Sequence, residues 1–119
     1  MYNRDLDKDL EKIDLDDELE TEDIEKICYF LQNYDSNYKT KNIWSLYGGA
    51  SSFYLNKNVH NVQYPVEDGL PNQEKMLNLG NEMKENNVDY FISYNKKFKI
   101  PNYKKVKTKG HAALYEKNF

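Results

Sequence analysis

A helical pattern that runs directly into a strand pattern is the feature of this chain that most restricts its fold. Met76, Leu79 and Met83 recur at helical spacing, which predicts a helix over residues 72–86. Residues 88–94 then combine branched and aromatic side chains, which is typical of a strand. A helix that is followed at once by a strand indicates layered α/β or α+β structure.

Two groups of further elements follow from periodicity and composition. Ile24, Ile27 and Leu31 follow the spacing of one helix face behind Thr21, a residue suited to capping, which predicts a helix over residues 22–34. Short branched and aromatic segments predict strands elsewhere. We expect strands at residues 42–47, 52–55 and 59–64, joined as a hairpin or meander with a turn at Gly48 and Gly49, and a lysine-rich hairpin that adds residues 103–106 and 112–115 to the sheet.

The length of the chain favours one domain. At 119 residues it is close to the commonest domain size, so one core is the simplest expectation. We expect a small single α+β domain in which about two or three helices pack on an antiparallel or mixed sheet of three to five strands. We assign residues 21–119 to this domain. Residues 1–20 are predicted to be an acidic arm or marginal helix, because only Leu6, Leu10 and Ile13 form an apolar stripe there.

Charge is distributed unevenly along the chain. Residues 1–35 contain 13 acidic and 4 basic residues, a net charge of −9, whereas residues 36–119 contain 7 acidic and 13 basic residues, a net charge of +6. Residues 96–109 contain seven lysines and no acidic residue. Such clusters often form solvated surface or neutralise one another across a fold. The remaining interpretation is that one of them binds a partner.

This distribution generates two binding hypotheses. In the first, a non-enzymatic protein of the inhibitor or immunity kind, encoded by a phage or other mobile element, uses its acidic amino-terminal surface against a basic partner protein. In the second, the lysine-rich segment and nearby Tyr94, Phe98 and Tyr103 bind single-stranded nucleic acid by charge and stacking. A single arginine, Arg4, argues against specific base recognition. The predicted contact residues are Asp5, Asp9, Asp14, Asp16, Asp17, Glu18, Glu20 and Glu22 in the first case, and Lys96, Lys97, Lys99, Lys104, Lys105, Lys107, Lys109 and Tyr103 in the second.

A small hydrolase is the third hypothesis, and its cysteine-dependent version needs Cys28 and His111. These are the only residues that can pair as thiolate and base, and residues 110–115 resemble the histidine strand of papain-like cysteine peptidases over six positions. In that family the cysteine begins a helix, whereas Cys28 falls on the apolar face in the middle of a predicted one. This position favours a buried structural cysteine.

The metal-dependent version is built on Asp68, Glu82 and Lys84, which fit a loose pattern of an acid followed by acid-x-lysine around Mg²⁺. A helix at Glu82 separates its side chain from that of Lys84. One cysteine and two distant histidines cannot complete a structural zinc site. Residues 48–52 lack the glycine spacing of a phosphate-binding loop, which favours a simple turn. We therefore predict neither a metal nor a cofactor.

Composition also suggests a location. No apolar run approaches the roughly 18–20 residues that span a bilayer, and Met1 leads into polar residues rather than an export signal. A single cysteine forms no internal disulfide and fits a reducing compartment. We expect a cytoplasmic protein without a membrane partner.

Overall fold

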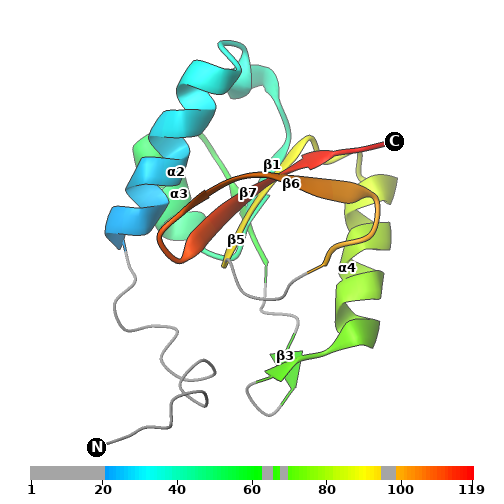
Figure 1. Ribbon diagram of the computed structural model, residues 1–119. Coiled ribbons are helices and arrows are strands. Elements are labelled where there is room, and N and C mark those ends of the chain that lie inside the picture. The colour runs from blue at the N-terminus through cyan, green and yellow to red at the C-terminus, as the bar shows by residue number, and fades with distance from the viewer. Residues whose placement is uncertain (1–20, 63–65, 68–69, 95–98) are drawn as a thin grey trace, which may run out of the picture.

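A five-stranded sheet forms the centre of the computed structural model, which describes residues 21–62, 66–67, 70–94 and 99–119 (Figure 1). In chain order the elements are α2 (Thr21–Tyr34), the 3₁₀ helix η2 (Tyr38–Thr40), β1 (Ile43–Ser45), α3 (Gly48–Leu55), β2 (His60–Asn61), β3 (Val66–Glu67), β4 (Leu70–Pro71), α4 (Gln73–Glu85), β5 (Tyr90–Tyr94), β6 (Tyr103–Lys109) and β7 (Ala112–Lys117). The sheet order is β2-β1-β5-β7-β6. β1 runs parallel to β2 and β5, whereas β7 runs antiparallel to β5 and β6, so the sheet is mixed. The short strands β3 and β4 form a separate antiparallel pair.

The central strand β5 is buried on both faces. Tyr90 and Ile92 belong to one core cluster, whereas Phe91 belongs to a second cluster on the opposite face. Successive side chains of a strand point to opposite sides of its sheet, so a single strand contributes to both cores. Each face therefore needs a helical cover, which makes the structure an α+β domain of three layers (Figure 1).

The helices α2 and α3 cover one face of the sheet (Figure 1). Ile24, Ile27 and Leu31 line the buried stripe of α2, and Leu55 joins them from α3. Glu22 and the following aspartate lie in the first turn of α2, where negative charge interacts favourably with the helix dipole.

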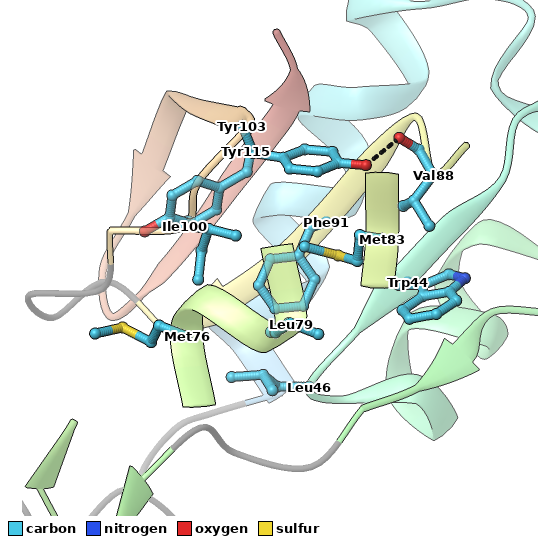
Figure 2. Packing of buried hydrophobic residues seen from close by; sticks show 11 residues of the cluster. Trp44, Leu46, Met76, Leu79, Met83, Val88, Phe91, Ile100, Tyr103 and Tyr115 are labelled. Carbon is cyan, nitrogen blue, oxygen red and sulfur yellow. Dashed lines mark hydrogen bonds between the residues drawn. The ribbon is translucent and has the colours of Figure 1, made fainter. Parts of the chain in front are cut away.

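The helix α4 covers the other face. Met76, Leu79 and Met83 recur every three or four residues and pack against the sheet (Figure 2). The side chain of Asn72 caps the helix, because its Oδ1 accepts a hydrogen bond of 2.8 Å from the backbone N–H of Lys75.

Most predicted elements are confirmed. The helices expected at residues 22–34 and 72–86 are α2 and α4, and the strand expected at residues 88–94 is β5. The lysine-rich hairpin is β6 and β7. The predicted fold class, a small α+β domain with two or three helices on a mixed sheet, is also confirmed.

The strand predicted at residues 52–55 is wrong, because these residues form the second half of α3. Their aromatic content is typical of strands, yet Ser51 and Leu55 lie four residues apart and are both buried, as on one helix face. The turn predicted at Gly48 and Gly49 is instead the start of this helix. The hairpin or meander is also wrong, because β1 and β2 are parallel and parallel strands need a crossover, which α3 supplies.

Gly48→Ala should destabilise the protein, whereas Gly49→Ala should not. A Cβ atom on Gly48 would lie 2.7 Å from Cβ and 2.9 Å from Cα of Asn61, so the backbone has to shift. We expect a loss of about 1–3 kcal/mol in the free energy of unfolding. A Cβ atom on Gly49 meets nothing within 4 Å, so the reduced entropy of the unfolded chain should give a gain of about 0.4–1 kcal/mol.

Urea unfolding of the two variants measures both effects. Equal free energies of unfolding for Gly48→Ala and Gly49→Ala would contradict the close approach of α3 to β2.

Candidate functional site

Lysines occupy four positions of β6, one of the two edge strands of the described five-stranded sheet. Lys104 and Lys105 are exposed, and Lys107 and Lys109 are partly exposed. Lysines on an edge strand discourage pairing with the edges of other molecules, which is their structural explanation. They also concentrate positive charge along one side of the domain, so this strand is the candidate binding surface of the described structure.

A register shift between Lys105 and Lys107 directs their side chains to opposite faces of the sheet. Lys105 is opposite Tyr115 and Lys107 is opposite Leu114, which are adjacent positions of β7. The Nζ of Lys105 lies 6.0 Å from the ring centroid of Tyr115, on the α4 side. The Nζ of Lys107 lies 5.3 Å from the ring centroid of Phe30, which belongs to α2. Both ammonium groups therefore lie over aromatic faces that favour a cation.

Three lysines share the α2 side of β6. Lys104, Lys107 and Lys109 pair with alternate residues of β7, and alternate residues of a strand face the same side. Within the described ranges, ion pairs join Lys26 to Glu22 and two other lysines to aspartates, and none involves these three side chains. We call Lys104, Lys107 and Lys109 the lysine edge.

The ring of Tyr103 is not accessible for base stacking. It is 7% exposed, and its hydroxyl donates a hydrogen bond of 2.7 Å to the carbonyl oxygen of Val88 (Figure 2). Burial also raises the pKa of Tyr103 to about 12. Lys99 is exposed. The other predicted nucleic-acid contacts, at positions 96 and 97, lie outside the described residues. The exposed lysines of β6 are compatible with binding of nucleic acid by charge, whereas the burial of Tyr103 argues against stacking by its ring.

Glu22 is the only predicted acidic contact residue within the described part of the chain. Its side chain is 77% exposed in the first turn of α2, and its Oε2 lies 3.8 Å from Nζ of Lys26. An exposed pair of this kind contributes little to stability. The remaining predicted acidic contacts lie outside the described residues: Asp5, Asp9, Asp14, Asp16, Asp17, Glu18 and Glu20.

Asp23 connects the start of α2 to the turn between β6 and β7. Its Oδ2 accepts a hydrogen bond of 3.0 Å from the backbone N–H of His111. The neighbouring Gly110 has a φ of 59°, and any side chain there would collide with the Asp23 carboxylate. The first turn of α2 therefore lies beside the turn that follows β6.

A polar network attaches the other end of α2 to the sheet. The Tyr34 hydroxyl donates to Oε1 of Glu116 over 2.7 Å, and Oδ2 of Asp35 accepts from the hydroxyl of Tyr90 over 2.7 Å and from Nζ of Lys41 over 2.6 Å. The hydrogen bond from Lys41 is the main reason that the pKa of Asp35 lies below its usual range. Burial, followed by the hydrogen bond to Asp35, raises the pKa of Tyr90. These groups position the helix by binding one another.

Cys28 is fully buried on the inner face of α2. Burial raises the pKa of its thiol to about 12, although a hydrogen bond with Ser51 acts in the opposite direction. His111 lies at the exposed turn before β7 rather than within a strand. A protonated thiol inside the core is neither a nucleophile nor accessible to a substrate, so this geometry does not support the cysteine-dependent hydrolase.

The metal-dependent version also lacks geometric support. Glu82 and Lys84 both lie on α4, two positions apart, where side chains diverge, and Lys84 places its Nζ 5.5 Å from the ring centroid of Phe119. Asp68 lies outside the described residues. Across the described ranges no group of three or more His, Cys, Asp or Glu side chains is arranged to bind a metal ion. The ring of His60 instead packs on Trp44, with 4.3 Å between the centroids.

None of the helices in the described ranges has both the length and the apolar character needed to cross a membrane. Comparison of the chain with protein-family models, with curated proteins and with solved structures found no match.

The Cys28 thiol should react with a water-soluble thiol reagent far more slowly in the native protein than in the unfolded chain. Raising the pKa of this thiol from its ordinary value of 9.0 to about 12 lowers the thiolate fraction at pH 8 on the order of a thousandfold. Burial blocks the reagent as well. Labelling rates at pH 8, with and without denaturant, test this expectation. Comparable rates in the two states would restore Cys28 as a candidate nucleophile.

Proposed function

We propose that this protein is a small non-enzymatic binding protein of the inhibitor or immunity kind, which uses its acidic amino-terminal segment against a basic surface of a partner protein. The observation that carries the proposal is the charge of residues 1–20, which contain nine acidic and three basic residues directly before α2. We call this segment the acidic arm.

The arrangement of the described domain supports this role. The helices α2 and α3 cover one face of the sheet and α4 covers the other (Figure 1). A segment as acidic as the arm carries too little apolar surface to add much to either core. The arm is therefore better suited to recognition than to packing.

Charge density gives the arm its selectivity. Residues 14–20 contain five acidic residues and no basic one. Each exposed ion pair contributes only about 0.2–1 kcal/mol, but clustered carboxylates attract a basic surface over about one Debye length and accelerate association. We expect a partner with a dense basic surface, such as the nucleic-acid groove of another protein, and binding that weakens as salt is added.

A second candidate function is binding of single-stranded nucleic acid at the lysine edge. It is favoured by the absence, among the described residues, of ion pairs to Lys104, Lys107 and Lys109. The net charge of −3 on the whole chain opposes it. For both candidate functions, we propose that the protein is cytoplasmic and is encoded by a phage or other mobile element.

Neutralising acidic residues of the arm should abolish partner capture. In the variant Asp16→Asn/Asp17→Asn/Glu18→Gln the arm loses three charges without losing length. The matched control Glu74→Gln/Glu82→Gln/Glu85→Gln removes three charges from exposed positions of α4. Affinity capture from a nuclease-treated lysate, followed by mass spectrometry, compares these chains with the natural sequence.

We expect the natural chain and the α4 control to enrich the same basic protein, and the arm variant to lose it by at least about tenfold, as a difference of 1.4 kcal/mol requires. A set of captured proteins that is the same for all three chains would reject the proposal. Capture that occurs in a parallel untreated lysate and disappears in the nuclease-treated one would favour the nucleic-acid alternative.

A further inference from the structure

Two lysines of the lysine edge face apolar residues across the sheet. Lys107 is opposite Leu114, and Lys109 is opposite Ala112. By contrast, Lys104 is opposite a glutamate of β7. Unlike charges that face one another on neighbouring strands stabilise the pair. Because β6 ends the order of the described sheet, a counter-charge for Lys107 and Lys109 fits on the outer side of this strand (Figure 1).

Thr108, which lies between these two lysines, has backbone groups that point away from β7. Lys109 and Ala112 are paired on either side of a two-residue turn, and the closing pair of such a hairpin is hydrogen-bonded. Bonded and non-bonded pairs alternate along an antiparallel ladder, so the next pair, Thr108 and Ala113, is a non-bonded one. Among the described residues, no hydrogen bond joins the backbone of Thr108 to a group beyond this hairpin. Its N–H and C=O therefore face the outer side of β6.

The ammonium group of Lys107 is held in position beside this edge. Its Nζ lies 5.3 Å from the ring centroid of Phe30, and Phe30 stacks on Tyr34 with 5.2 Å between the centroids. The hydroxyl of Tyr34 in turn donates its hydrogen bond of 2.7 Å to Glu116. A charge that is already positioned loses less conformational entropy when a carboxylate binds it. The α2 side of the edge is therefore prepared to bind an anion.

The geometry distinguishes among the chains that fit a positively charged edge. A second copy of β6 is disfavoured, because antiparallel pairing of two such strands places lysine beside lysine. A phosphate backbone matches the charge, but its oxygens only accept hydrogen bonds, which leaves the C=O of Thr108 without a donor. An extended peptide offers both N–H and C=O groups, and its alternate side chains point to one side of the sheet. Carboxylates at alternate positions of a peptide thus reach the side that Lys107 and Lys109 share.

We propose that residues 107–109 of β6 bind an extended acidic segment of a partner protein, which adds to the sheet as a further strand. The backbone of Thr108 exchanges hydrogen bonds with this segment, and Lys107 and Lys109 pair with carboxylates at alternate positions along it. In this mode of recognition the backbone bonds supply affinity and the side chains select the sequence. The inference goes beyond the proposed function, because it assigns a second surface to a partner of opposite charge, and it does not rest on that function.

Binding of a defined peptide to the full chain tests the proposal. The probe is a fluorescein-labelled peptide of about eight residues, within the usual length of a strand, in which glutamate and threonine alternate. A control peptide has the same composition, with all glutamates before the threonines. Fluorescence anisotropy at about 50 mM salt should show several-fold tighter binding of the alternating peptide, because only alternation places its carboxylates on one side of the sheet.

Removal of the two lysine charges should weaken binding of the alternating peptide about tenfold in the variant Lys107→Gln/Lys109→Gln. The matched control Lys39→Gln/Lys75→Gln removes the same charge at exposed positions away from β6 and should change the affinity little. Equal affinities of the two peptides for the natural chain, or of the two variants for the alternating peptide, would overturn the inference.

Hydrogen exchange of the Thr108 amide tests the addition of a strand. This amide should exchange rapidly in the free protein and become protected when the alternating peptide is bound, whereas the amide of Lys109 is bonded within the hairpin in both states. Thr108→Pro removes the outward N–H at an edge position that tolerates proline, so it should abolish peptide binding without a change in charge. If thermal unfolding shows that this variant does not fold, exchange in the natural chain decides alone.

Unchanged exchange at Thr108 in the peptide-saturated protein would contradict strand addition. Oligothymidine that binds more tightly than the peptide, and leaves this exchange unchanged, would make the edge a nucleic-acid surface and overturn the inference. Neither result affects the capture of a basic protein, on which the proposed function depends.

Discussion

Burial of β5 on both faces is the constraint on which the rest of the structure depends. Phe91, Ile92 and Ser93 have no exposed surface, and the strand pairs in parallel with β1 and antiparallel with β7. A strand of this kind needs helices on both sides, which α2 and α3 supply on one face and α4 on the other. The lysine-rich strand β6 lies at the edge of this sheet, where its four lysine side chains remain exposed or partly exposed to water.

Local patterns predicted the helices α2 and α4 and the strand β5, because periodicity and composition agree there. They failed at residues 52–55, where aromatic content favoured a strand and the parallel crossover between β1 and β2 required a helix. Local patterns also do not predict the order of the strands in the sheet. The sequence of β6 alone does not indicate that β7 lies between β6 and β5.

The candidate site was likewise predicted only in part from the sequence. The lysine cluster was evident from composition, but the register shift that separates Lys105 from Lys107 depends on pairing with β7. The link between Asp23 and His111 joins residues 88 positions apart, and the bond from Tyr34 to Glu116 spans 82. Contacts of that range depend on the assembled sheet. The burial of Tyr103, which removes it from a stacking role, likewise depends on its packing among core residues from α4 and β5.

The described domain holds itself together without the acidic arm, because its helices already cover both faces of the sheet and Asp23 ties the start of α2 to the turn after β6. The most direct test is thermal unfolding of the full chain and of residues 21–119. Both should unfold cooperatively with closely similar Tm values, because so acidic a segment adds little apolar surface to either core. A shortened chain that no longer unfolds cooperatively, or that unfolds at a much lower temperature, would contradict this expectation.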